Sequence, residues 1–220
     1  KTNQNGIVGD FNTSGIDSVI NEIEEVLDES ENSKKILRIF RKCYSAKNLS
    51  ESSRLLINEL FGKYGIVILD ANDKKLKQKL IPIIKEDVVN QNLHSIISER
   101  TEELSDEFKS QAFVRNINFF NISEGKRERI TKKVSEDEIE NNPEIFSPNV
   151  LIRPLYQELI LPNIAYIGGG AEISYWMQLK TVFKYLSIPF PVLVLRNSVM
   201  WTEEKDFKKW TKLGFEINDI

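Results

Sequence analysis

Three consecutive glycines, Gly168 to Gly170, stand between an apolar run and an amphipathic segment. The apolar run at 164–167 is short, as buried strands are, and residues 172–186 carry apolar side chains at helical spacing. A second short apolar run follows at 191–195. A strand, a helix and another strand in this order form a βαβ unit, with parallel strands and a right-handed crossover. We therefore predict an α/β, Rossmann-like fold built on a parallel sheet.

The first third of the chain has the apolar spacing of helices, followed by one strand. Gly65 is expected to end the last of these helices, because glycine readily adopts the left-handed conformation common at helix ends. The apolar residues Ile66 to Leu69 come next and are typical of a buried strand. The expected helices are 14–27, capped by Ser14; a second that follows Ser33; and 50–64.

The middle of the chain mixes helical and hairpin patterns. Pro82 should interrupt one helix, and a second helix is expected over 93–108. Residues 119–130 resemble a β-hairpin with a turn at Gly125, and Ser135 begins a capping box. We therefore divide the chain into a helical segment (1–64), a Rossmann-like core (65–73 and 146–220) and an inserted connecting segment (74–145). In the core, helices are expected from Pro148 to Ile160 and over 203–213.

Composition excludes several classes of function. A net charge of -3 and a pI near 5.5 argue against a nucleic-acid binder, which carries a basic surface. The apolar runs are too short to cross a bilayer, and the polar start of the chain does not resemble a signal peptide. The single cysteine, Cys43, has no internal disulfide partner, so we expect a cytoplasmic protein with a buried, inert thiol.

The glycine run is a candidate ligand site. Ligands of open α/β sheets bind beyond the carboxyl ends of the strands, where glycine lets backbone N–H groups approach them. The run does not match the dinucleotide-binding pattern, because Ile173 stands three residues after Gly170. Glu172 would repel a phosphate but could bind an ammonium or hydroxyl group. A tight turn with a favourable charge at the helix start explains the same residues equally well.

Other polar residues near the predicted strand ends are weaker candidates. Arg196 follows the second strand, where a guanidinium could bind a carboxylate or phosphate, although a surface ion pair is an equal alternative. Arg153 is better explained as solvent-facing. Tyr175 lies three residues after Glu172 and could direct its hydroxyl to the same pocket. His94, the only histidine, has no ligand partners in its sequence neighbourhood, so no metal site is predicted.

Several stretches resemble the cysteine-adding enzyme family of bacillithiol biosynthesis. The similarity is strongest in Ser147 to Gln157 (SPNVLIRPLYQ) and Ala165 to Trp176 (AYIGGGAEISYW). It continues through 178–180, 189–192 and Arg196, and Tyr64 to Asp70 (YGIVILD) is similar to an earlier family segment. Within these stretches Asn149 and Gln157 join Gly168, Gly169, Gly170, Glu172, Tyr175, Arg153 and Arg196 as candidates for binding substrate or nucleotide.

The resemblance implies a nucleotidyltransferase-like Rossmann core with inserted segments, and a ligase that adds cysteine to glucosaminyl-malate in the last step of bacillithiol biosynthesis. Amide formation requires carboxyl activation, for which ATP or ADP is the expected nucleotide. The resemblance also implies a homodimer formed through a C-terminal coiled coil that these 220 residues lack.

The chain lacks two N-terminal motifs of this family, so it resembles the central portion of the enzyme and is expected to be inactive alone. The catalytic residues are therefore left unassigned. The alternative function is a non-catalytic α/β module that binds a nucleotide or sugar at the glycine turn. The missing motifs, if present in the parent reading frame, would favour the ligase.

Overall fold

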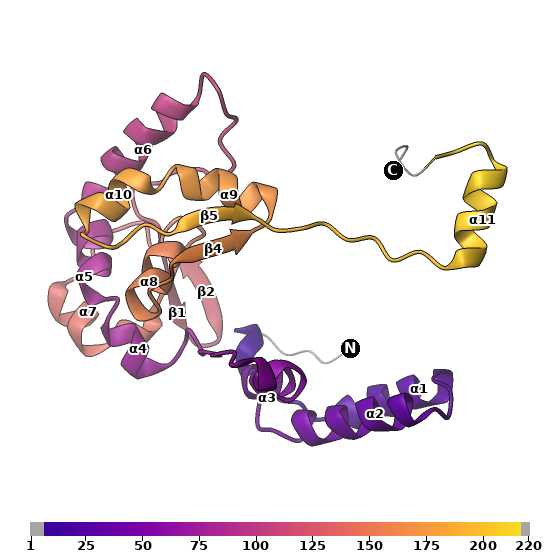
Figure 1. Ribbon diagram of the computed structural model, residues 1–220. Coiled ribbons are helices and arrows are strands. Elements are labelled where there is room, and N and C mark those ends of the chain that lie inside the picture. Colours follow the sequence, from indigo (N-terminus) through magenta and orange to yellow (C-terminus); the bar gives the residue numbers. More distant parts are fainter. Residues whose placement is uncertain (1–6, 217–220) are drawn as a thin grey trace.

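The computed structural model describes residues 7–216, and its N-terminal part is a group of three helices. The helices are α1 (Ile16–Val26), α2 (Glu31–Tyr44) and α3 (Leu49–Phe61). Helix α2 packs against both α1 and α3, and α1 and α2 lie side by side away from the sheets (Figure 1). All three helices were predicted, but α1 and α2 do not begin at the expected residues. Gly15 rather than Ser14 precedes α1, and Ser30 rather than Ser33 caps α2, because its hydroxyl accepts the N–H of Ser33.

The predicted strand at Ile66 to Leu69 is wrong. Gly65, with a φ of 77°, ends the helical segment as expected, but the residues after it pair with no strand in the described part of the chain. Val67 is 64% exposed. An apolar run becomes a strand only when a neighbouring strand accepts its backbone hydrogen bonds, and the sequence pattern does not contain that information.

A second group of short helices packs on the main core. It comprises α4 (Lys74–Gln78), α5 (Ile81–Ile84), a π-helical turn (Lys85–Val89) and α6 (Asn92–Leu104). Pro82 lies in the first turn of α5, where its missing N–H has no cost, so the predicted interruption is confirmed. Helix α7 (Glu136–Asn141) is capped by Ser135, also as predicted.

The first sheet is antiparallel and has the order β2-β1-β3. The predicted hairpin is confirmed as β1 (Phe119–Ser123) and β2 (Lys126–Arg129), joined by Glu124 and Gly125, both with positive φ. The third strand, β3 (Phe146–Pro148), pairs with β1.

Pro148 ends this strand and does not open a helix, so that prediction is wrong. The Asn149 side-chain oxygen accepts the N–H groups of Leu151 and Ile152, which delays α8 (Arg153–Ile160) until Arg153. Pro154 then occupies the first turn of α8.

The second sheet is the parallel pair that the βαβ pattern predicted. It consists of β4 (Ala165–Gly168) and β5 (Val192–Leu195), and they are the only strands of this sheet within residues 7–216. The connection is not one helix but two, α9 (Gly170–Met177) and α10 (Lys180–Tyr185). Between them the backbone tightens to i−3 hydrogen bonds, and the buried amide of Gln178 donates to Thr101 and Ser110.

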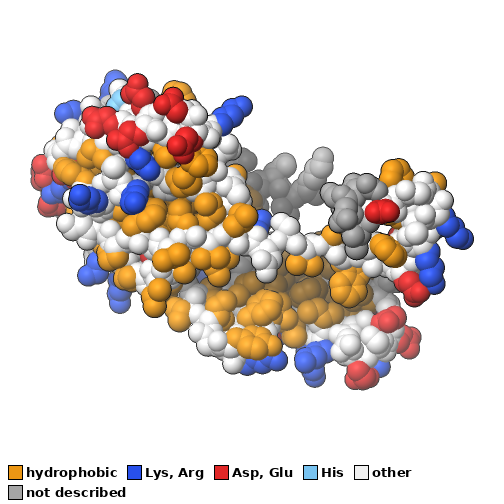
Figure 2. Space-filling model, turned by 45° about the horizontal axis from the view of Figure 1, so that its top comes forward, with side chains coloured by type: hydrophobic (Ala, Val, Ile, Leu, Met, Phe, Trp, Pro, Cys, Tyr) orange, Lys and Arg blue, Asp and Glu red, His pale blue; other side chains and the backbone are white. Residues whose placement is uncertain are grey.

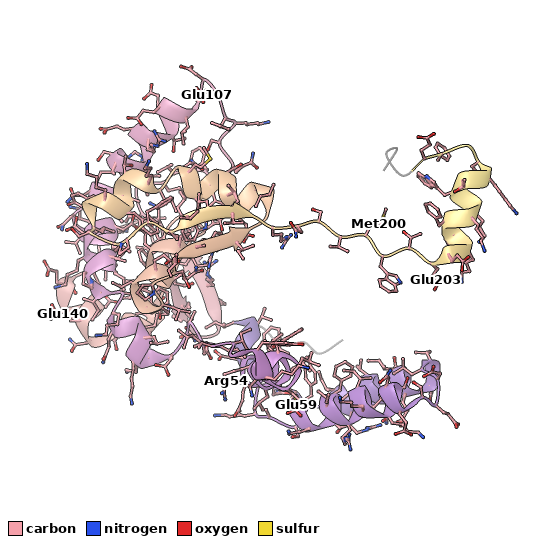
Figure 3. All side chains as sticks on the ribbon, viewed as in Figure 1. Arg54, Glu59, Glu107, Glu140, Met200 and Glu203 are labelled. Atoms are coloured by element: carbon pink, nitrogen blue, oxygen red, sulfur yellow. The ribbon has the colours of Figure 1, made fainter. Side chains whose placement is uncertain are left out.

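One buried apolar cluster joins the second helical group, both sheets and helices α7 to α10. It contains residues of both the expected insertion and the expected Rossmann-like core, and the domain division stays a prediction. Helix α11 (Glu204–Lys212) lies apart, beyond an extended segment that carries Met200 (Figure 3). In the space-filling view, apolar side chains gather in a hollow between the core and the outlying helices (Figure 2). No helix in the described range 7–216 is long and apolar enough to cross a membrane.

Candidate functional site

The glycine turn joins the carboxyl ends of the two parallel strands. The backbone N–H of Arg196, the residue after β5, donates to the carbonyl of Gly168 at the end of β4 (2.9 Å). Gly169 follows Gly168 in the chain, and its backbone N–H donates to the Glu172 carboxylate (2.9 Å). This bond closes the first turn of α9. The parallel pairing therefore brings Glu172 and Arg196 to one edge of the sheet, as the sequence predicted.

The three glycines have different roles. None has a positive φ, so the turn does not depend on glycine's backbone freedom. A Cβ atom on Gly168 would lie 2.6 Å from Cε1 of Tyr166, so glycine is required there by close packing. A Cβ on Gly170 would meet no atom within 4 Å among the described residues, which leaves open space over the start of α9.

Glu172 is held as an ionised carboxylate. The Gly169 N–H contributes most to lowering the pKa of Glu172, against an opposing effect of burial. The Tyr166 hydroxyl donates to its second oxygen (3.1 Å) and lowers that pKa further. The positive charges of Arg153 and Arg196 act in the same direction. Glu172 is therefore anionic at neutral pH.

Arg196 extends its guanidinium over the turn. A Cβ on Gly169 would lie 3.4 Å from Nη2 of Arg196. Among the described residues it forms no ion pair, so the surface ion-pair interpretation is not supported. Arg196 lies close enough to Glu172 to lower the pKa of that carboxylate, but its guanidinium is not held in an ion pair and remains available to an anionic ligand.

Arg153, Gln157 and Tyr175 form a second group beside Glu172. Arg153 donates to the Gln157 side-chain oxygen (2.8 Å) and to the Tyr175 hydroxyl (3.4 Å), so it links α8 to α9. Burial alone would lower the pKa of Arg153, but the nearby phenols of Tyr175 and Tyr166 raise it above its usual value. Its interpretation as a solvent-facing residue is therefore wrong.

Asn149 lies in a different hydrogen-bond network. Its amide nitrogen donates to the Asn118 side chain (2.9 Å), and Asn118 in turn donates to the buried carboxylate of Asp87. Burial raises the pKa of Asp87 to about 6, and the bonds from Asn118 act against that rise. Together with its cap on residues 151 and 152, this gives Asn149 a structural explanation.

The sequence reasoning missed a cavity of about 470 Å³ on the other side of Arg153. Its polar lining includes Lys77 from α4, Arg127 from β2, and Ser147 and Tyr156. A smaller cavity of about 260 Å³ adjoins Arg153, Tyr156 and Gln157. No sequence signal separates Lys77 from the neighbouring surface lysines, because the distinction depends on how α4 packs.

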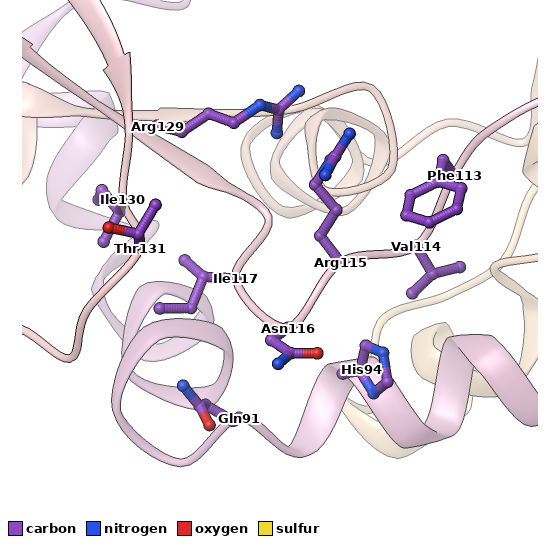
Figure 4. Close-up of a pocket in the computed structure, with 10 residues that line it drawn as sticks. All are labelled: Gln91, His94, Phe113, Val114, Arg115, Asn116, Ile117, Arg129, Ile130 and Thr131. Atoms are coloured by element: carbon purple, nitrogen blue, oxygen red, sulfur yellow. The ribbon is translucent and has the colours of Figure 1, made fainter.

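Another cavity, of about 440 Å³, contains the only histidine (Figure 4). His94 lies there beside Asn116, with Arg115 and Arg129 on the opposite wall. Within the described range no group of three or more histidine, cysteine or acidic side chains could hold a metal ion. Cys43 is buried, as predicted, and burial raises its thiol pKa.

Comparison with known proteins places these features in a family context. Residues 1–197 match the family model described as bacillithiol biosynthesis BshC, N-terminal Rossmann-like domain, whereas the sequence patterns had suggested a central portion.

Curated relatives named "Putative cysteine ligase BshC" include proteins from Flavobacterium johnsoniae (41% identity over 98% of the chain and 44% of the relative) and Flavobacterium psychrophilum (40% over 100% and 44%). The Staphylococcus aureus relative is 26% identical over 76% of the chain and 35% of its own length. The chain thus spans less than half the length of the curated relatives it matches.

Proposed function

Because the chain belongs to the bacillithiol biosynthesis BshC family, we propose that it is part of a ligase that joins cysteine to glucosaminyl-malate. In this reaction the carboxyl carbon of cysteine forms an amide bond with the nitrogen of the sugar amine. Overall the carboxylate loses one oxygen and the ammonium loses two protons, which together make one water. The observation that carries the proposal is the pair of Glu172 and Arg196 at the carboxyl ends of β4 and β5.

Glu172 is suited to binding the amine substrate. Its lowered pKa keeps it ionised, and an ionised carboxylate attracts the ammonium form of an amine. The same lowered pKa makes Glu172 a weak base at neutral pH. We therefore assign Glu172 to holding and orienting the amine and leave proton removal to another group.

Arg196 is suited to binding a carboxylate. Its guanidinium lies beside Gly169, close to the carboxylate assigned to the amine. A guanidinium can bind the two oxygens of a carboxylate at once and fix its orientation. Arg196 would then hold one substrate while Glu172 holds the other, and the paired positions would bring the reacting groups together.

The glycine turn is a poor cradle for nucleotide phosphates. The N–H of Gly169, which would face a phosphate, already donates to Glu172, and the carboxylate would repel the phosphate charge. ATP or ADP, if used to activate the carboxyl group, must bind through other residues. We derive no step of the reaction through it.

The remaining features of the proposal rest on the family relationship. They are a larger parallel, nucleotidyltransferase-like core in the full-length protein, a homodimer formed through a coiled coil outside these 220 residues, and a cytoplasmic location. The single, buried Cys43 is compatible with a reducing compartment.

The test is turnover by the full-length protein. Purified enzyme incubated with cysteine, glucosaminyl-malate and ATP should yield bacillithiol by mass spectrometry. Glu172→Gln should lower turnover, whereas the matched control Glu107→Gln, a change of an exposed glutamate near the end of α6, should not (Figure 3). Tight substrate binding without any product would instead support the non-catalytic binding module.

A further inference from the structure

Three cationic side chains line one cavity that contains no acid. Lys77, Arg127 and Arg153 all border the cavity of about 470 Å³, and no Asp or Glu of the described chain lines it. Within residues 7–216 none of the three forms an ion pair. Concentrated positive charge in a cavity whose lining contains no acid attracts an anionic ligand.

Lys77 is the most unusual member of this group. Lys77 is only 3% exposed, and the one side-chain hydrogen bond that its ammonium makes in the described structure goes to the neutral carbonyl of Phe146. Burial, with a contribution from Arg127, lowers the pKa of Lys77 to about 8, so it still carries its charge at neutral pH. Burying an ammonium without a carboxylate costs free energy that a bound anion would recover.

The two arginines are fixed in position before any ligand binds. Arg127 donates to the Ser147 hydroxyl (3.1 Å) and the Pro148 carbonyl (3.1 Å), and its guanidinium lies 3.6 Å from the ring centroid of Phe120. Arg153 is fixed by its bonds to α8 and α9 described above. Cations held in place lose little conformational freedom when they bind an anion.

We propose that this cavity binds a small dianion: either two carboxylates on adjacent carbons or a phosphate group. The inference rests on the proposed function, because the two sources present there are the malyl group of the sugar substrate and the phosphates of a nucleotide. Three cations exceed the charge of either group, and the two guanidinium planes can each bind a pair of oxygens. The cavity has the volume typical of small-ligand sites.

The test is calorimetric titration of the full-length protein in chloride buffer at pH 7. L-malate and inorganic phosphate serve as the two probes, with succinamate as the singly charged control. Wild type should bind one dianion more tightly than succinamate. Lys77→Met and Arg127→Met should each weaken that binding by about tenfold or more.

Arg129→Met is the matched control for Arg127. Both arginines lie on β2 and over the ring of Phe120, but Arg129 lines the other cavity, so its loss should leave dianion binding unchanged. If malate binds more tightly than phosphate, the cavity is the site for the malyl group of the sugar substrate. If phosphate binds more tightly, the cavity is the site for the phosphates of a nucleotide.

Equal affinity in wild type, Lys77→Met and Arg127→Met, or no binding of either dianion, would overturn the proposal. Thermal melting checks that each variant is folded. The charge-retaining Arg127→Lys should recover part of the lost affinity if Arg127→Met lowers the melting temperature. Dianion binding with no bacillithiol formation would count against the proposed ligase alone.

Discussion

Replacing Lys77 with methionine should change how the stability of the 220-residue chain depends on pH. The pKa of Lys77 falls from 10.5 to about 8 on folding. Because a pKa difference of one corresponds to about 1.4 kcal/mol, the buried ammonium costs roughly 3 kcal/mol at pH 7. The unfolded chain binds this proton more tightly than the folded chain does. The charge therefore destabilises the fold fully below pH 8, and the penalty disappears as the pH rises towards 10.5.

The charged groups that face Lys77 are few. Arg127 shares its cavity, as does Arg153, and the ring of Tyr156 lies 5.9 Å from Nζ. Burial raises the pKa of Tyr156 to about 12, with smaller contributions from Asp73 and Asp70, so its phenol stays neutral in the relevant range. The pH dependence between 7 and 9.5 should therefore come from Lys77 itself.

The measurement is urea unfolding of wild type and Lys77→Met at pH 7 and 9.5 in chloride buffer. Relative to the variant, wild type should gain about 2 kcal/mol between the two pH values, a shift of about 1 M in the urea midpoint. Subtracting the free energy of unfolding of the variant from that of wild type at each pH cancels the contribution of every titrating group that the two proteins share. Lys79→Met, which removes an exposed lysine after α4, should keep the wild-type pH dependence. Parallel stability curves for wild type and Lys77→Met would refute the reasoning.

Four further outcomes are expected, and the first three concern the glycine turn. Gly168→Ala should lower the free energy of unfolding by about 1–3 kcal/mol, because the new Cβ would lie 2.6 Å from the Tyr166 side chain. Gly170→Ala should change that free energy by less than about 0.5 kcal/mol, because its Cβ would lie in open space. Chemical denaturation measures both. In the full-length enzyme, Glu172→Gln should cost only about 0.3–1 kcal/mol of stability but lower turnover by about tenfold or more, and wild-type kinetics would reduce Glu172 to a helix cap. Arg196→Met should raise the KM for substrate with the melting temperature nearly unchanged; a large thermal loss with normal KM would make it structural. The 220-residue chain alone should form no bacillithiol by mass spectrometry.

Local patterns in the sequence predicted local structure well. The hairpin turn at Gly125 and the interruption at Pro82 depend on residues close in the chain. The parallel pair around Gly168 follows from the order of one strand, a helical segment and the next strand. The errors occurred where a distant partner decides the outcome. Ile66 to Leu69 lacks a neighbouring strand, and Pro148 is drawn into a sheet by pairing with Phe119.

The candidate site divides in the same way. The positions of Glu172 and Arg196 follow from strand order alone, so the sequence could place both at one sheet edge. Lys77 and Arg127 are 50 residues apart and come from a helix and a hairpin, and only tertiary packing brings them to one cavity. Tyr166 was not predicted as a site residue, because an aromatic side chain in a strand usually packs in the hydrophobic core. Here its hydroxyl donates a hydrogen bond to Glu172.

The stacking of Tyr166 on Trp176 provides an optical probe of the site. The two ring centroids are 4.1 Å apart. The Tyr166 hydroxyl donates a hydrogen bond to the carboxylate of Glu172, the residue that we propose binds the substrate amine. Trp176 is fully buried, whereas Trp201 is 91% exposed, so aqueous acrylamide should quench the fluorescence of Trp201 and spare that of Trp176. A ligand that displaces the Tyr166 hydroxyl would then alter the residual emission, and binding at the glycine turn could be followed without any added label.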